Sequence, residues 1–92
     1  MKNPLATPPS PSGRMVWNLD WNLIRTFLVI VEQGGITAAA NALRLKQPSV
    51  SNALRRLEGH LAKRLIVRGH GQFEVTPAGR LLYEEAIAEV LS

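Results

Sequence analysis

Apolar residues recur at helical spacing in the segment that follows Asp20, a residue type that commonly caps helix N-termini. The spacing alternates between three and four residues and predicts an amphipathic helix over about 21–33. Gly34 and Gly35 then end this helix, because glycine readily adopts the left-handed conformation of a helix C-terminus. The apolar side chains expected on its buried face are Trp21, Ile24, Phe27, Leu28 and Val31.

Two further helices are predicted before residue 62. Thr37 is expected to cap a short helix over 38–43, whose run of alanines would let another helix approach closely. Pro48 is tolerated in a first helical turn, so the next helix should begin near Gln47. Val50, Leu54, Leu57 and Leu61 would form its buried stripe. The opposite face would carry Pro48, Asn52, Arg55 and Arg56, flanked by Ser49 and Ser51.

A hairpin and a last helix complete the pattern. Residues 64–68 are compact and partly β-branched, residues 69–71 are Gly-His-Gly, and residues 72–75 alternate polar with apolar, which predicts two short strands joined by a turn. Thr76 would cap the last helix, with Pro77 in its first position. Its apolar residues exceed what a lone solvated helix needs, so we expect it to have a partner outside the core of the monomer.

The length and the proline distribution indicate one small domain with an N-terminal leader. The 92 residues can bury a single small core. Four of the six prolines fall within residues 1–18, among Ser, Thr and Gly, a composition that opposes both helix and packed strand. We therefore expect residues 1–18 to be a flexible leader.

Charge divides the structured part of the chain in two. The net charge of the whole chain is only +4, but Glu58 is the single acidic residue between Ile36 and Gly71, a stretch that is otherwise rich in lysine and arginine. The segment after Gln72 carries an acidic surplus. This asymmetry predicts that the middle of the chain meets a polyanion.

Composition also limits the compartment and the chemistry. The chain has no cysteine, and its longest run of aliphatic and aromatic residues, 27–31, is far shorter than a membrane span. No signal-peptide pattern precedes Pro8. We expect a soluble, cytoplasmic protein that makes no contact with membranes.

No catalytic or metal-binding motif stands out. His60, expected in a loop, and His70, expected in the hairpin, lack the spacing of metal ligands, and Glu84, Glu85 and Glu89 are typical of a solvated helix face. No nucleophile elbow or phosphate loop is present. We therefore expect no metal, no cofactor and no enzymatic activity.

The layout favours a nucleic-acid-binding function. Two short helices joined by a tight turn, the second with small polar and basic side chains opposite its apolar stripe, suit the DNA major groove. Gln47, Ser51 and Asn52 have the donors and acceptors that base edges require. Arg55 and Arg56 could meet guanine edges or phosphates, and the sequence does not choose between them. The hairpin would lie beside the helix as a wing.

From about residue 19 to the end, the chain resembles the DNA-binding heads of LysR-type transcriptional regulators. Thr37–Ala40 is similar to the T-x-A-A step of that family, residues 47–51 (Gln-Pro-Ser-Val-Ser) to its Q-P-x-x-S motif, and 75–79 (Val-Thr-Pro-Ala-Gly) to its L-T-x-A-G step before a linker helix. Arg56-Leu57-Glu58, Leu61, Leu65 and Arg68 match the intervening stretch. No one of these motifs is specific, but the ordered set is.

The resemblance implies a mainly α fold: a winged helix-turn-helix, with a three-helix core and a short β-hairpin wing, over 19–76, followed by a linker and dimerisation helix over 77–92. The helix-turn-helix itself would span about 36–55. The implied partners are double-stranded promoter or operator DNA and a second copy of the chain. The resemblance carries over Gln47, Pro48, Ser51 and Asn52 as groove-facing residues and Arg68 as a backbone contact. Together with the candidates from the layout, the predicted DNA-binding residues are Thr37, Gln47, Pro48, Ser49, Ser51, Asn52, Arg55, Arg56, Arg68 and His70, and the predicted dimerisation residues are Leu81, Leu82, Ile87, Val90 and Leu91.

The chain departs from the family pattern at several positions. Lys46 stands where Ser or Thr commonly caps the recognition helix, Asn52 where Arg is frequent, Ala62 where Gly is usual and Ile66 where Phe is usual. The wing also lacks an arginine often found there. Full-length members carry a C-terminal effector-binding domain, so we expect these 92 residues to be a fragment that would meet a small-molecule effector only through that absent domain.

Two other function classes are weighed against this one. A winged helix can be an architectural or protein–protein interaction module, in which case alanine at Gln47, Ser51 and Asn52 would leave DNA affinity unchanged. An enzyme would need a catalytic constellation from outside the chain. A bound metal or cofactor would favour that reading.

Overall fold

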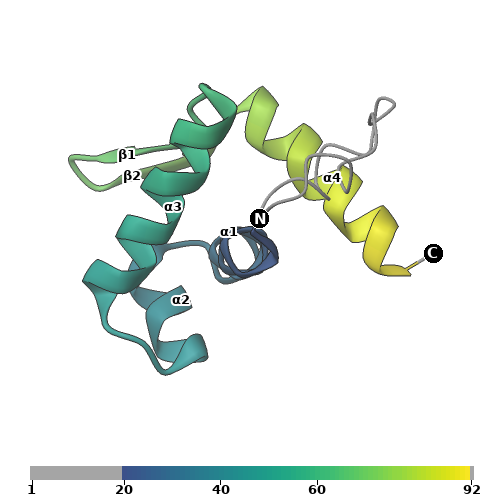
Figure 1. Cartoon of the computed structure of the whole chain (residues 1–92). Helices are drawn as coiled ribbons and strands as arrows, with labels where there is room; N and C mark the ends of the chain where they lie inside the picture. Colours follow the sequence, from purple (N-terminus) through teal and green to yellow (C-terminus); the bar gives the residue numbers. More distant parts are fainter. Residues whose placement is uncertain (1–19, 92) are drawn as a thin grey trace, which may run out of the picture.

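The computed structural model describes residues 20–91, and the expected leader lies outside them. The order of elements is α1 (Trp21–Gln33), α2 (Ile36–Leu43), α3 (Gln47–Leu61), β1 (Ile66–Gly69), β2 (Gln72–Val75) and α4 (Pro77–Leu91). The mainly helical winged fold predicted from the sequence is confirmed. In Figure 1 the β1–β2 hairpin projects at the left of the molecule, and α4 extends away from the core at the right.

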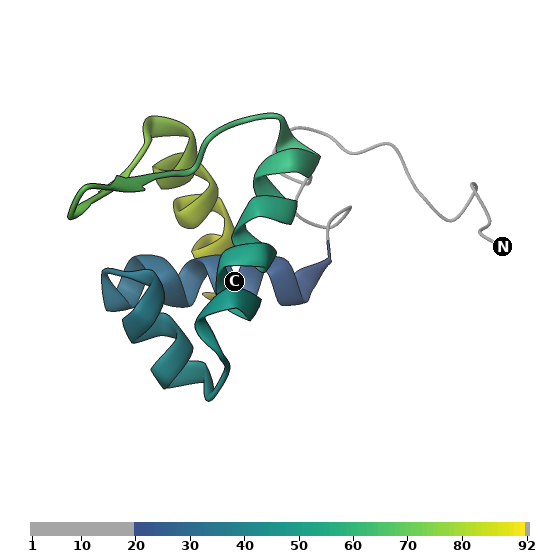
Figure 2. The ribbon, with the colours of Figure 1, turned by 90° about the vertical axis from the view of Figure 1, so that its left-hand side faces the viewer.

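The first helix lies at the centre of the fold. Its ends follow the prediction, because the Asp20 side chain accepts a hydrogen bond from the Asn22 amide at 2.9 Å and Gly34 is left-handed, with φ of 80°. Since α1 contacts α2, α3 and α4, its buried surface is wider than one stripe and includes Leu23 and Ile30 as well as the expected Phe27. Figure 2 shows α1 lengthwise, with α3 crossing in front of it.

Two residues of α1 are less buried than the periodicity predicted. Trp21, in the first turn of α1, is 41% exposed, and Val31 is only partly buried. The large side chains fully buried in the core include Ile24, Phe27, Leu54 and Leu57. The core of residues 20–91 contains no buried polar or charged residue.

The expected capping role of Thr37 is wrong. Helix α2 begins at Ile36, its N-cap is Gly35, and no side chain caps it. Gly34 ends α1 and Gly35 is extended, so the chain turns within two residues and Ile36 already packs against the core. Thr37 is an exposed residue of the first turn. Ala39 and Ala40 are buried, as close approach of another helix requires.

The long helix α3 follows the predicted pattern over most of its length. Val50, Leu54 and Leu57 are buried, whereas Leu61 in the last turn is only partly buried. His60 also lies in that last turn and not in a loop. The C-cap residue, Ala62, takes the left-handed conformation with φ of 55°, which explains why glycine suits this position better.

The hairpin is confirmed, with a shifted first strand. β1 and β2 are antiparallel and pair Ile66 with Val75 and Gly69 with Gln72. His70 and Gly71 form a two-residue turn in which both φ angles are positive, at 52° and 77°, as in the turns that suit tight hairpins. β1 does not start at residue 64, because the carbonyls of Arg64 and Leu65 accept hydrogen bonds from Thr76 and do not pair with a strand.

The last helix packs on the head through part of its surface. α4 contacts α1 and β2, and Leu82 and Ala86 join the core. Leu82, one of the expected dimerisation residues, is only 4% exposed and packs in the core of the monomer. Within residues 20–91 no single helix could cross a membrane. By length and composition only the pair α1 and α2 could, and this pair is bent by 118°.

Candidate nucleic-acid interface

The outer face of α3 gathers most of the residues singled out in the sequence. Because Val50, Leu54 and Leu57 anchor the opposite face in the core, the rotation of α3 about its own axis is fixed. Ser51 is half-buried at the edge of this face. The exposed residues along it are Gln47, Pro48, Ser49, Asn52, Arg55 and Arg56.

The start of α3 is free of side-chain caps. Lys46 occupies the N-cap position and makes no capping hydrogen bond, as expected for a residue with no acceptor in its side chain. Only its backbone carbonyl contributes, accepting from the amides of Ser49 and Val50. Pro48 lies in the first turn, as predicted. The polar side chains of this turn therefore remain exposed.

The preceding turn and α2 contribute less polar surface. Thr37 is exposed at the beginning of α2. Between α2 and α3, Arg44 is left-handed with φ of 60° and donates its backbone N–H to the carbonyls of Ala40 and Asn41. This tight turn holds the two helices of the helix-turn-helix together without any side-chain hydrogen bond.

The wing places its two predicted residues differently. His70 is exposed at the tip of the turn. Arg68 is half-buried and pairs across the strands with Phe73, and such cross-strand partners share one face of a hairpin. Since Phe73, Ile66 and Val75 pack against the core, Arg68 lies on the inward face of the wing.

Glu58 has a structural role that the sequence reasoning missed. Its Oε2 accepts hydrogen bonds from the backbone amides of Leu65 and Ile66, at 2.8 Å and 3.2 Å. This carboxylate thus ties α3 to the start of β1 across seven residues. Its isolation as the single acid between Ile36 and Gly71 was the available sequence signal, but only the folded chain shows what it binds.

Thr76 and Gly79 close the same junction from the other side. The Thr76 hydroxyl donates to the Arg64 carbonyl at 2.6 Å and accepts from the Gly79 amide at 3.0 Å, so its predicted role as the α4 cap is confirmed. A Cβ atom added at Gly79 would overlap the Leu65 carbonyl oxygen. Glycine here lets α4 approach the chain that leads into the wing.

A hollow of about 280 Å³ lies between α3 and β1. Arg55 and Glu58 line it from α3, Arg64 from the loop and Arg68 from β1. Three arginines and one glutamate therefore line the same hollow. Arg64 was not among the predicted DNA-binding residues, because nothing in the sequence shows that it meets the other two.

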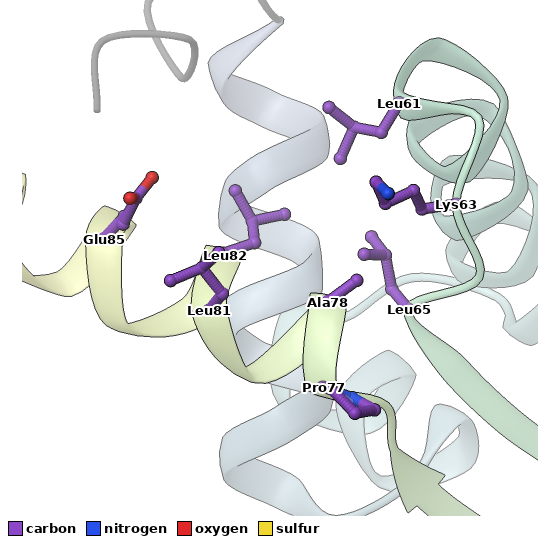
Figure 3. Close-up of a pocket in the computed structure, with 8 residues that line it drawn as sticks. All are labelled: Leu61, Lys63, Leu65, Pro77, Ala78, Leu81, Leu82 and Glu85. Carbon is purple, nitrogen blue, oxygen red and sulfur yellow. The ribbon is translucent and has the colours of Figure 1, made fainter. Parts of the chain in front are cut away.

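An apolar groove of about 490 Å³ separates the end of α3 from the first half of α4 (Figure 3). Figure 3 shows Leu61, Lys63 and Leu65 on one wall and Ala78, Leu81 and Leu82 on the other. Leu81, Val90 and Leu91 are 56%, 53% and 78% exposed, and Ile87 is partly buried. Of the predicted dimerisation residues, Leu81 and the largely buried Leu82 line the groove, and Val90 and Leu91 lie exposed at the end of α4.

One hydrogen bond ties α4 to α1. The Tyr83 hydroxyl donates to a carboxylate oxygen of Glu32 at 3.3 Å. Partial burial of the phenol, together with the negative charge of Glu32 and this hydrogen bond, raises the pKa of Tyr83 above its ordinary value. Among residues 20–91 no three His, Asp or Glu side chains are grouped so that they could hold a metal ion.

Comparison with known proteins gives consistent results for most of the chain. Residues 21–80 match the profile described as "Bacterial regulatory helix-turn-helix protein, lysR family". The regulator CysL of Bacillus subtilis is 36% identical over 66 residues, which is 72% of this chain and 22% of CysL. The activator BauR of Pseudomonas aeruginosa is 37% identical over 79 residues, 86% of this chain and 26% of BauR. The chain thus spans about a quarter of these relatives.

Solved structures show the same similarity in three dimensions. The CbnR DNA-binding domain in a DNA complex has a TM-score of 0.74 at 29% identity, covering 78% of this chain and 83% of that one. The BenM DNA-binding domain in complex with catB site 1 DNA has a TM-score of 0.73 at 32% identity, covering 78% and 77%. The profile match, the relatives and the shared fold agree, and this chain belongs to the lysR family of bacterial regulatory helix-turn-helix proteins.

Proposed function

We propose that this chain is the DNA-binding part of a transcription regulator and binds duplex DNA with sequence preference. The observation that carries the proposal is the outer face of α3, where polar and basic side chains are exposed opposite an entirely apolar buried stripe. A helix of this kind fits the major groove, about 12 Å wide. The similarity to two DNA-binding domains solved with DNA supports the same conclusion.

Roles follow from chemistry and position. Gln47, Ser51 and Asn52 would contact base edges, since amides and hydroxyls can both donate and accept. Pro48 and Ser49 would lie against the groove wall, and Thr37 against the backbone at the start of α2. Arg56 can reach either guanine or phosphate. The wing residues Arg68 and His70 would contact the sugar-phosphate backbone, which positions the head without specifying sequence.

The proposed assembly is a homodimer formed through α4. Support comes from Leu81, Val90 and Leu91, which are large, apolar and exposed on a helix that has already buried Leu82 and Ala86 in its own head. Exposed apolar surface of this kind commonly marks an interface. Two heads would then read two half-sites of one operator in the bacterial cytoplasm. A small-molecule effector would act only through residues outside this chain.

Fluorescence anisotropy tests the DNA-binding proposal. The chain is titrated onto duplexes from its own promoter region and onto a scrambled duplex, at two salt concentrations, with Asn52→Ala and Arg25→Ala as variants. We expect salt-dependent binding that prefers one site, a preference lost in Asn52→Ala and kept in Arg25→Ala, because Arg25 is exposed on α1. If all duplexes bind equally, and alanine at Gln47, Ser51 and Asn52 changes nothing, the winged helix is an architectural or protein-binding module.

Sedimentation velocity tests the dimer. We expect the sedimentation coefficient of the parent to rise with protein concentration. Leu81→Glu/Leu91→Glu should remain monomeric, because both side chains are exposed and their replacement leaves the head intact. A parent chain that stays monomeric at all concentrations would contradict dimerisation through α4 alone.

A further inference from the structure

The hollow between α3 and the wing carries an inference that goes deeper than the proposed function and rests on it. We propose that Arg55, Arg64 and Arg68 jointly bind one phosphate group of the DNA backbone in this hollow, and that Glu58 is the positioning residue that holds the three guanidinium groups around it. The site lies where the recognition helix meets the wing.

The three arginines reach the hollow from three separate segments. Arg55 lies one turn before Glu58 on α3, and residues three apart on a helix are neighbours. Arg68 is on the inward face of the wing, which its pairing with Phe73 establishes. Arg64 precedes β1 and is exposed. The fold therefore brings the three arginines to one hollow. Three arginines that bound separate phosphates would not need to share it.

The charge balance favours an anion. Within residues 20–91 the structure shows no salt bridge from Arg55, Arg64 or Arg68, and the hollow holds three positive groups and one negative group. The nearby Glu58 carboxylate already accepts from two backbone amides through Oε2. The three positive charges repel one another, and the negative charge of one bound phosphate group would offset that repulsion. Guanidinium groups also match phosphate geometry through paired N–H donors.

Glu58 sets the geometry of the site through the backbone. Its two hydrogen bonds fix Leu65 and Ile66, which directly follow Arg64 and end two residues before Arg68. The same side chain is carried by α3 beside Arg55. One carboxylate therefore links the three segments that carry the arginines, which is the kind of support that a preorganised binding site needs.

Salt-dependent anisotropy on the intact chain tests the site. Arg64→Gln is titrated onto the preferred promoter duplex and onto a scrambled duplex, beside Arg25→Gln as a charge-matched control. We expect about tenfold weaker binding to both duplexes, and a salt slope shallower by about one, because one phosphate contact is lost without any loss of sequence preference. Arg64→Gln/Arg68→Gln should cost less than the product of the single effects, since both residues share one phosphate.

The outcomes separate this site from the proposed function. If Arg64→Gln binds like Arg25→Gln while Asn52→Ala loses its preference, the site is wrong and the proposed function stands. If the parent chain binds no duplex, both fall. The source of the anion is identified by titrating the chain separately with inorganic phosphate and with duplex, while the NMR resonances of the arginine Nε–H groups are followed. Shifts with inorganic phosphate and none with duplex would overturn the DNA assignment.

A pair of Glu58 variants tests the positioning role. Glu58→Ala should weaken duplex binding and lower the salt slope as Arg64→Gln does, because the arginines lose their common support. Glu58→Gln keeps an acceptor oxygen and should restore both the affinity and the slope. Equal losses in the two variants, or an unchanged slope in Glu58→Ala, would contradict this role.

Discussion

The helix-turn-helix, formed by α2 and α3, and the junction between the wing and α4 are held together in different ways. No side chain caps α2 or α3, and their buried residues are entirely apolar. At the junction, by contrast, Glu58 and Thr76 bind backbone groups of Arg64, Leu65 and Ile66. The first region relies on packing alone, whereas the second adds side-chain hydrogen bonds to the packing of Leu65 and Ile66.

The difference shows that a small domain can leave polar side chains exposed on one surface, while other polar side chains hold its segments together elsewhere. Side chains of α3 that cap nothing, such as Gln47 and Ser49, remain available for a ligand. A two-stranded hairpin buries too little apolar surface to be stable alone. The wing therefore depends on the packing of Ile66, Phe73 and Val75 against the core and on the hydrogen bonds that Glu58 and Thr76 supply.

The largest expected effect is on the packed region. Leu54→Ala should lower the free energy of unfolding by about 3 kcal/mol, because it leaves a cavity in the core where the side chain is fully buried. Thermal or urea denaturation followed by circular dichroism measures this. Leu45→Ala is the matched control, since Leu45 is 48% exposed and its loss should cost little. Equal losses would mean that the apolar packing of α3 is not what holds the helix-turn-helix.

The next effect is on the close approach at the junction. Gly79→Ala should cost about 2 kcal/mol, because its Cβ would overlap the Leu65 carbonyl oxygen and force α4 away from the chain entering the wing. Urea denaturation gives the value. Gly59→Ala, in α3 with open space around the added methyl group, should not destabilise the fold. A Gly79→Ala variant as stable as the parent would show that α4 can shift at no cost.

The third largest effect is expected at the hydrogen bonds that join Glu58 to the start of the wing. Glu58→Ala should cost about 1.5 kcal/mol, since two partly buried amides lose their acceptor. Amide hydrogen exchange should accelerate at Leu65 and Ile66 more than in α1. Glu74→Ala, on the outward face of the hairpin, is the control and should leave both amides protected. Uniform acceleration over the whole chain would instead indicate global destabilisation.

A smaller effect is expected where the backbone of α3 ends. Ala62→Gly should stabilise the fold by about 1 kcal/mol, because Ala62 is left-handed and glycine adopts this conformation without steric penalty. The midpoint of urea denaturation should rise. Ala53→Gly, inside α3, serves as the reverse control and should lower it. A lower midpoint for Ala62→Gly would contradict the left-handed cap.

The smallest effect concerns the contact between α4 and α1. Because the folded state raises the pKa of Tyr83 above its ordinary value of 10.0, its neutral form is favoured on folding. The stability it contributes is complete below pH 10 and is lost as the pH rises through the raised pKa. Tyr83 is the only tyrosine, so ultraviolet absorbance during alkaline titration reports it directly. Glu32→Gln should lower this pKa, and no change would contradict the contact.

The pattern of residues determined the order of elements and the identity of α3. Periodicity, Asp20, Gly34 and the Thr76–Pro77 pair gave helix positions close to those observed, because capping and backbone preferences act within a few residues. It also placed Gln47, Asn52, Arg55 and Arg56 on one outer face of α3, because residues on one helix keep a fixed angular relation. The base and phosphate contacts of these residues remain predictions.

The tertiary structure alone decided what distant segments do to one another. It exposed Trp21, buried Leu82 and brought Arg64 to the same hollow as Arg55, Glu58 and Arg68. Local propensity carries no information on these outcomes, because they depend on which surfaces meet when α4 and the wing pack on the core. The spacing of residues along the sequence determined which side chains share a face of each helix. Tertiary packing determined which of those faces became buried and which remained exposed.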